Sequence, residues 1–130
     1  MIVRVLIVDD DEDARILLTR ALNKGGLSVE VISATDGRDA LERTADAPPH
    51  AVITDVMMPR MNGLELCAAL RSAPATARVP LIIVSALEDE RDRAAGLAAG
   101  ADDYLTKPFN WAQLTGRLGE LVRQRYGGGD

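Results

Sequence analysis

The stretch IVDDDED (residues 7–13) ends an apolar run with five consecutive acids. Like charges this close repel one another, and a carboxylate near a protein core is costly to desolvate. Helix capping explains part of the run, because Asp11 or Asp10 can cap a following helix and Glu12 and Asp13 suit its positive end. The rest of the run needs a reason that capping does not give.

Composition limits the classes of protein that this chain can represent. It has 130 residues, 47% of them hydrophobic, and a net charge of −5. We predict one domain over residues 1–126 and a flexible glycine-rich tail at 127–130. The acidic balance disfavours direct nucleic-acid binding, which requires a basic face. No apolar run is long enough to span a membrane and the N-terminus lacks the basic region of a signal peptide, so we expect a cytoplasmic protein.

The chain has a single cysteine and a single histidine. Cys67 cannot form an intramolecular disulfide or a cysteine metal cluster, and its place in a helical pattern predicts a small buried side chain. His50 follows two prolines and precedes an apolar run, which is typical of a turn residue. A single histidine makes neither a triad nor a metal site by itself.

Short apolar runs alternate with segments of helical periodicity along the whole chain. Three of the runs are almost continuously apolar, as expected for parallel strands that are buried on both faces. Right-handed crossovers then predict a doubly wound (βα)5 flavodoxin-like sandwich around a five-stranded parallel sheet. The predicted strands are 3–8, 28–33, 51–54, 80–85 and 103–106, and the predicted helices are 12–24, 37–46, 63–72, 88–99 and 110–125.

In such a sheet, ligands bind at the carboxyl ends of the strands. Those ends present Asp9 and Asp10, then Asp55, Ser85 and Lys107. Three carboxylates on one rim would repel unless a cation lies among them, and oxygen ligands with few carboxylates favour Mg²⁺. The lysine and the serine hydroxyl suit an anion that meets the metal, as a phosphoryl group would.

At these same positions the sequence resembles the receiver domain of two-component response regulators. Four motifs carry the resemblance and fall in order on the predicted strand ends. They are VDD at 8–10, DVMMPRMNG at 55–63, VSA at 84–86 and GADDYLTKPF at 100–109.

The resemblance implies a role for each matching residue at the acidic rim. Asp55 is implied to be the phosphoacceptor, taking a phosphoryl group from a phosphohistidine. Asp10, Asp55 and the backbone carbonyl of Met57 are implied to bind Mg²⁺, with Mn²⁺ as an alternative ion, and Asp9 to act through metal-bound water. Lys107 is implied to pair with Asp55 at rest and with a phosphoryl oxygen afterwards.

Further roles are implied on the last two strands. Ser85 and Ala86 are implied to bind the phosphoryl group, and Ser85 and Tyr104 to form the conformational switch. The Lys107–Pro108 peptide bond is implied to be cis. Without the resemblance, Tyr104 reads as a half-buried strand residue.

The implied function is signalling rather than turnover. The expected partner is a histidine kinase or a histidine phosphotransfer protein, and the expected readout surface is formed by segments 88–99, 103–106 and 110–125. This surface is also a candidate for homodimerisation, although a solvated charged face explains its charges equally well. Met57 and Leu87 offer no group to orient a hydrolytic water, so we expect slow self-dephosphorylation.

Other classes of protein fit the residues less well. An aspartate-nucleophile phosphohydrolase usually has a second aspartate where Met57 stands, so we do not expect an enzyme. A nucleotide or flavin binder needs a glycine-rich loop where DDDEDAR stands. A pseudo-receiver that binds partners without phosphorylation is disfavoured by the complete set of acidic, hydroxyl and lysine residues.

Overall fold

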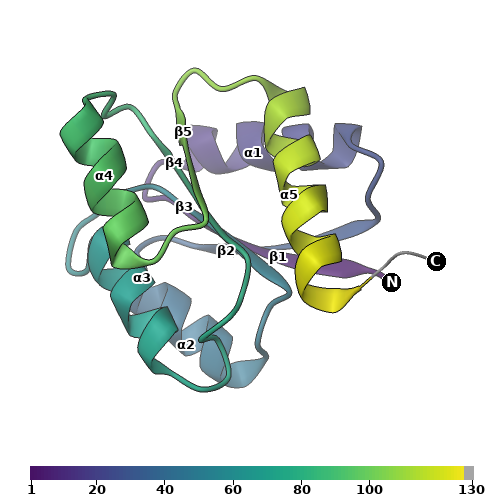
Figure 1. The fold of residues 1–130 in the computed structure, drawn as a ribbon, viewed down its shortest axis with the longest axis horizontal. Coiled ribbons are helices and arrows are strands. Elements are labelled where there is room, and N and C mark those ends of the chain that lie inside the picture. The colour runs from purple at the N-terminus through teal and green to yellow at the C-terminus, as the bar shows by residue number, and fades with distance from the viewer. Residues whose placement is uncertain (128–130) are drawn as a thin grey trace.

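Strands and helices alternate five times along residues 1–127, the part of the chain that the computed structural model describes (Figure 1). The predicted tail lies mostly outside this range, at residues 128–130. The strands are β1 (Val3–Val8), β2 (Val29–Ala34), β3 (Ala51–Thr54), β4 (Leu81–Ser85) and β5 (Asp103–Thr106). The helices are α1 (Glu12–Lys24), α2 (Gly37–Asp46), α3 (Gly63–Ser72), α4 (Glu90–Ala99) and α5 (Trp111–Tyr126).

The strands form one parallel sheet in the order β2-β1-β3-β4-β5. The chain first places β2 on one side of β1 and then places β3 on the other side, so the carboxyl ends of β1 and β3 lie next to each other. Their register pairs Val8 with Thr54, which are the last residues of the two strands. Whatever follows these two residues therefore meets at one point on the rim of the sheet.

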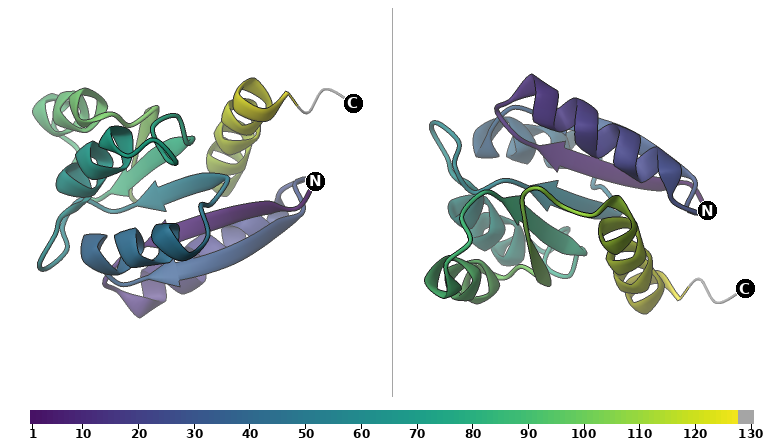
Figure 2. Two further views of the ribbon diagram at one scale, coloured as in Figure 1. Left: turned by 90° about the horizontal axis from the view of Figure 1, so that it is seen from below. Right: turned by 90° about the horizontal axis from the view of Figure 1, so that it is seen from above.

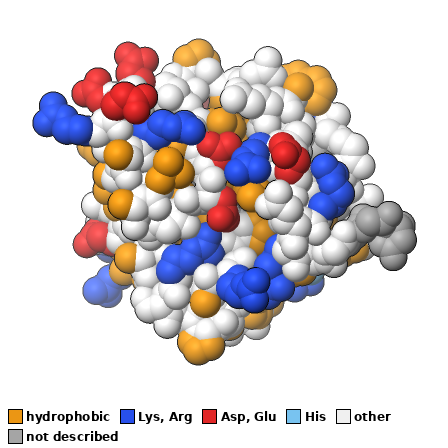
Figure 3. All heavy atoms as spheres, in the orientation of Figure 1, with side chains coloured by type: hydrophobic (Ala, Val, Ile, Leu, Met, Phe, Trp, Pro, Cys, Tyr) orange, Lys and Arg blue, Asp and Glu red, His pale blue; other side chains and the backbone are white. Residues whose placement is uncertain are grey.

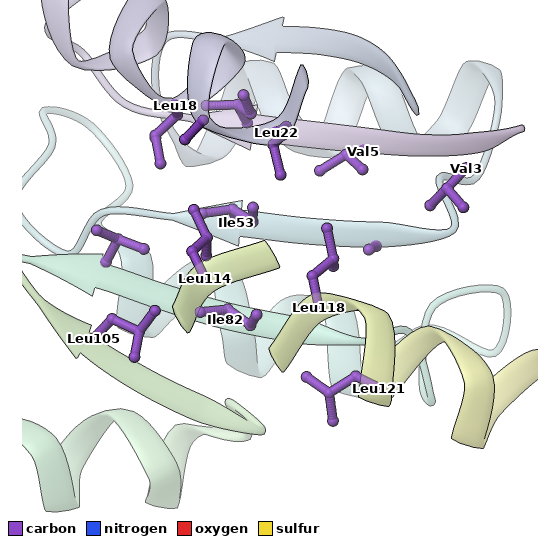
Figure 4. Close-up of a cluster of buried hydrophobic side chains, with 14 of the residues drawn as sticks. Val3, Val5, Leu18, Leu22, Ile53, Ile82, Leu105, Leu114, Leu118 and Leu121 are labelled. Atoms are coloured by element: carbon purple, nitrogen blue, oxygen red, sulfur yellow. The ribbon is translucent and has the colours of Figure 1, made fainter. Parts of the chain in front are cut away.

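The helices cover both faces of the sheet, with α1 and α5 on one face and α2, α3 and α4 on the other (Figure 2). On the first face, Leu18 and Leu22 of α1 and Leu114 and Leu118 of α5 pack on inward-facing strand residues such as Ile53 (Figure 4). The three central strands are buried almost throughout, because helices exclude water from both of their faces. The predicted doubly wound sandwich is confirmed.

Most predicted element boundaries agree with the structure, and the differences have local causes. β4 begins after Pro80, which has no N–H to donate to the sheet. α4 begins at Glu90 because Asp89 is extended, and α5 begins after Asn110, whose side chain accepts hydrogen bonds from two N–H groups of the first turn. Asp11 caps α1, one of the two caps predicted from the acidic run, because its side chain accepts a hydrogen bond from the N–H of Asp13 at 3.1 Å.

The single cysteine is buried in the core, and the single histidine forms hydrogen bonds with residues distant in the sequence. Cys67 is fully buried on α3, as predicted, and burial raises the pKa of its thiol to about 12. His50 Nδ1 accepts a hydrogen bond from the N–H of Arg4 at 2.8 Å, and its carbonyl accepts from the Tyr126 hydroxyl at 2.9 Å. Within residues 1–127, no helix is both long and apolar enough to cross a membrane.

Candidate functional site

Asp9 and Asp55 follow the adjacent ends of β1 and β3. The N–H of Asp9 donates to Ala34 and that of Asp55 donates to Val8, so both residues continue the sheet by one hydrogen bond. The Asp9 side chain is only 1% exposed, whereas that of Asp55 is 13% exposed. Asp55 therefore faces an opening through which another molecule can approach, and Asp9 lies beneath it.

One ammonium group bridges these two carboxylates. Lys107 Nζ lies 3.0 Å from Asp9 Oδ2 and 3.1 Å from Asp55 Oδ2. Burial by itself would lower the pKa of Lys107, but the hydrogen bonds and charges of both carboxylates outweigh it and raise that pKa. Burial raises the pKa of Asp9, against the lowering effects of the Asp11 N–H and of Lys107. The ammonium of Lys107 thus does not fully offset the loss of water around the Asp9 carboxylate.

The structure brings two of the three predicted carboxylates together on one ammonium. Among residues 1–127, no group of three acidic, histidine or cysteine side chains is placed to hold a metal ion. Asp9 and Asp55 are drawn together by Lys107, while Asp10 is exposed to solvent. The Asp9 carboxylate is buried beneath the rim, where it also accepts from the Asp11 N–H at 2.9 Å.

The residues of the rim nevertheless suit a hard cation. Two carboxylates share one ammonium, and a third carboxylate, that of Asp10, stands exposed beside them, so negative charge is in excess. Mg²⁺ typically takes one or two carboxylates and completes its shell with water and phosphate oxygens. Asp10, Asp55 and the carbonyl of Met57 supply oxygen donors of that kind.

Ser85 and Tyr104 meet at the main chain of Leu87. The Ser85 side chain is fully buried, and its Oγ accepts from the Leu87 N–H at 3.1 Å. The Tyr104 ring is also buried, and its hydroxyl donates to the Leu87 carbonyl at 2.6 Å. The structure thus connects the two predicted switch residues through one loop residue, and Ser85 Oγ makes this bond rather than one to Asp55.

The remaining predicted residues lie around the opening. The Lys107–Pro108 peptide bond is cis. The Met57 side chain is 65% exposed and Ala86 is also exposed, so both border solvent.

An open cavity adjoins Lys107 on the α1 side of the site. Its volume is about 610 Å³, and its lining includes Lys107, Leu17, Phe109 and Trp111. Leu17 is 58% exposed and Trp111 is 43% exposed, which are high values for large apolar side chains. An exposed apolar groove next to a functional site is typical of a protein contact.

Sequence reasoning missed the contacts of two arginines near the site. Arg15 donates to the backbone carbonyl of Asp9 at 2.7 Å, and Arg60 pairs with the buried carboxylate of Asp36. Arg15 stands on α1 at a spacing that allows a contact with the end of β1, but nothing in the sequence singles it out. Asp36 and Arg60 are 24 residues apart and meet only in the folded chain.

Comparisons with known proteins agree with this geometry. The family model for the response regulator receiver domain matches residues 5–119. The chain is 48% identical over 124 residues to the response regulator MprA of Mycolicibacterium vanbaalenii, a match that covers 95% of this chain and 52% of that protein. The chain thus spans about half the length of the curated relatives it matches.

Solved structures give the same result. The receiver domain of Francisella response regulator 1452 superimposes with a TM-score of 0.84 at 32% identity, covering 95% of this chain and 98% of that one. The BeF3-activated receiver domain of DrrB gives a TM-score of 0.82 at 31% identity, covering 95% and 99%. The chain belongs to the response regulator receiver domain family, as the four motifs predicted.

Proposed function

We propose that this chain accepts a phosphoryl group on Asp55 and that the modification changes its α4–β5–α5 surface. The observation that carries the proposal is the Lys107 ammonium bridging Asp9 and the more accessible Asp55. That arrangement places a nucleophilic carboxylate at an opening and holds a positive charge where phosphoryl oxygens would arrive. The BeF3-activated form of the related DrrB receiver domain supports the same reading.

The chemistry needs few protein groups. An oxygen of the Asp55 carboxylate attacks phosphorus, the bond from phosphorus to the donor imidazole nitrogen breaks, and the imidazole leaves with that electron pair. Lys107 then exchanges its bond to Asp55 for one to a phosphoryl oxygen. A Mg²⁺ ion held by Asp10, Asp55 and the Met57 carbonyl would offset the charge of the phosphoryl oxygens.

The response to phosphorylation begins at Ser85. Its hydroxyl would leave the Leu87 N–H and donate to a phosphoryl oxygen, beside the N–H of Ala86. The loop that also holds Tyr104 by the Leu87 carbonyl would then move. The modification can shift the conformational equilibrium only by the difference in contact energy between the two states.

The readout surface carries both signs of charge (Figure 3). Asp103 of β5 pairs with Arg93 of α4 at 3.5 Å and with Arg117 of α5 at 3.0 Å. Ion pairs within one chain therefore connect the three elements of this surface. We propose that a second copy of the chain binds here after phosphorylation. Pairing across the interface would then compete with these internal pairs.

The donor is proposed to be a histidine kinase or a histidine phosphotransfer protein that docks in the groove beside Lys107. Leu17 and Trp111 offer exposed apolar contact area there, and Lys107 lines both the groove and the phosphorylation site. A helix seated in this groove would bring its histidine toward Asp55. A small phosphodonor such as acetyl phosphate does not need this contact.

The test is mass spectrometry of the protein after incubation with acetyl phosphate and Mg²⁺. We expect one added phosphoryl group in the wild type and in Asp39→Asn, a variant of a carboxylate outside the site. The addition should be absent in Asp55→Asn and should fall when EDTA replaces Mg²⁺. A phosphoryl group that persists in Asp55→Asn would refute the assignment of the acceptor.

The lifetime of the phosphoryl group follows from the side chains near Asp55. Neither Met57 nor Leu87 can orient a water molecule for attack, so we propose slow self-dephosphorylation and no turnover of phosphate esters. Met57→Asn introduces a polar side chain at the mouth of the site and should speed the decay. Decay at the wild-type rate or slower would contradict this part of the proposal.

A further inference from the structure

The loop between β3 and α3, residues 55–62, is held tightly at its far end. The N–H of Gly63 donates to the Val56 carbonyl at 2.8 Å. A Cβ atom at Gly63 would lie 1.9 Å from the Asp55 carbonyl oxygen, so only glycine permits this approach. The loop therefore begins and ends at nearly the same point, and the Met57 carbonyl lies within it.

The outer part of the loop is bent and rests on the N-terminus of α2. Arg60 has a φ of 63°, in the left-handed region that residues with a Cβ rarely occupy, and the N–H of Met61 donates to the Pro59 carbonyl at 2.7 Å. The N–H of Gly37 donates to the Met61 carbonyl at 3.1 Å. A Cβ at Gly37 would lie 2.5 Å from Met61 Cγ, so the loop and the helix are in direct contact.

An ion pair completes this contact. The Asp36 side chain is 1% exposed, and its Oδ1 caps α2 by accepting from the N–H of Asp39 at 2.9 Å. Its Oδ2 accepts from the guanidinium of Arg60, whose side chain is 65% exposed. A buried carboxylate needs such a partner, and an exposed arginine in an unfavourable backbone conformation needs a restraint. Arg60 supplies the partner that the buried Asp36 carboxylate needs, and Asp36 restrains the conformation of Arg60.

We infer that Asp36 and Arg60 are positioning residues for the cation and phosphoryl site. They hold the Pro59–Met61 turn on α2 and thereby fix the part of the loop that presents the Met57 carbonyl. The inference rests on the proposed function, since the Met57 carbonyl matters only if a cation binds there. Neither side chain is proposed to touch the cation or the phosphoryl group.

The test compares three variants with a matched control in the full chain. Asp36→Asn keeps a good helix cap and removes the charge that Arg60 binds. Arg60→Ala removes the guanidinium, and Arg60→Lys keeps a positive charge and should restore part of the effect. Asp39→Asn is the control, because its carboxylate lies at the same helix end but contacts Thr35 and Arg43 instead of the loop.

Two measurements are made on each protein. Amide hydrogen exchange without added metal reports on residues 56–61 and should be faster in Asp36→Asn and Arg60→Ala than in wild type and Asp39→Asn. Titration with Mg²⁺, followed by amide spectra, should give an affinity about tenfold lower in the same two variants. A purely structural role would lower the unfolding midpoint but leave the Mg²⁺ affinity of the folded protein unchanged.

The outcomes separate this inference from the proposed function. If wild type binds Mg²⁺ and is phosphorylated while both variants bind Mg²⁺ as tightly as wild type, the inference is overturned whatever the exchange shows, and the proposed function stands. If wild type neither binds Mg²⁺ nor takes a phosphoryl group, the proposed function fails, and with it the positioning role for that site. The exchange measurement then still decides whether the ion pair restrains the loop.

Discussion

Replacing Lys107 with methionine removes one positive charge from the centre of the site and keeps a side chain of similar length. In the wild type, Nζ lies 3.0 Å from Asp9 and 3.1 Å from Asp55. After the substitution, the Asp9 carboxylate keeps the hydrogen bond from the Asp11 N–H but has no cation. The two carboxylates also face each other without a charge between them.

The size of the effect follows from burial. Breaking a buried ion pair by removing one partner costs about 3–5 kcal/mol, because an uncompensated charge stays behind. Here Lys107 is 26% exposed and Asp55 is 13% exposed, so solvent screens part of the charge. We therefore expect a loss of about 2–3 kcal/mol in the free energy of unfolding at neutral pH, or roughly 10 °C in the unfolding midpoint.

The pH dependence distinguishes this cause from loss of packing. Lys107 has a raised pKa, so its contribution to stability is present below its ordinary value of 10.5 and is lost as pH rises through the folded-state pKa. Asp9 also has a raised pKa, because burial disfavours its charged form. Without Lys107 that pKa rises further, and acidification neutralises the unpaired carboxylate. The stability deficit of Lys107→Met should therefore shrink as pH falls.

The assay is urea unfolding of wild type and variant at about pH 7 and about pH 5. The matched control is Lys24→Met, which changes the net charge equally at an exposed lysine that lies 5.8 Å from the Trp111 ring. The reasoning is refuted if Lys107→Met is no less stable than Lys24→Met at neutral pH. It is also refuted if the deficit stays constant or grows at the lower pH.

Three further predictions concern other parts of the molecule. Leu17→Asp should slow phosphotransfer from a phosphorylated kinase but should not slow phosphorylation by acetyl phosphate. The control, Ile16→Asp, lies on the same helix but outside the groove and should change neither rate. An equal loss of phosphotransfer in both variants would show that the donor does not dock in the groove. Gly63→Ala should lower the free energy of unfolding by about 3 kcal/mol or more, measured in urea, because its Cβ would lie 1.9 Å from the Asp55 carbonyl oxygen; a loss under about 1 kcal/mol would show that the loop yields. Burial and then the charge of the neighbouring Arg4 lower the pKa of His50, so wild type should lose stability as pH falls through 6.5, the ordinary pKa of histidine. His50→Asn should not show this loss. Parallel pH profiles of the two unfolding midpoints would contradict the prediction.

Sequence patterns predicted the fold because the strongest signals were local. The apolar runs that became β1, β3 and β4 are buried almost throughout, and a segment of helical periodicity follows each strand. Boundaries differed where one residue's chemistry decided them, as at Pro80 and Asn110. α3 begins where it was predicted, at Gly63, and the structure shows a full capping box there between Asn62 and Glu65.

The site was predictable only as a set of strand ends. Placing Asp9, Asp55 and Lys107 on one rim needed nothing beyond the alternation of strands and helices. Which carboxylate is buried, and that one ammonium serves two acids, depends on side-chain depth, which a linear pattern does not encode. The pair of Asp36 and Arg60 depends on the path of two loops and leaves no periodic signal.

The main chain of Leu87 connects Ser85, at the proposed phosphorylation site, with Tyr104, on the proposed readout surface. Its N–H binds Ser85 Oγ, and its carbonyl binds the Tyr104 hydroxyl. A Cβ at Gly96 of α4 would lie 2.8 Å from the Tyr104 ring, so this ring and α4 are packed without spare room. Each hydrogen bond contributes on the order of 1 kcal/mol net, so exchanging these two bonds can shift the equilibrium by roughly ten- to thirtyfold. A receiver that switches in this way needs no large rearrangement of its sheet, because movement of one loop releases or retains the aromatic ring on which α4 rests.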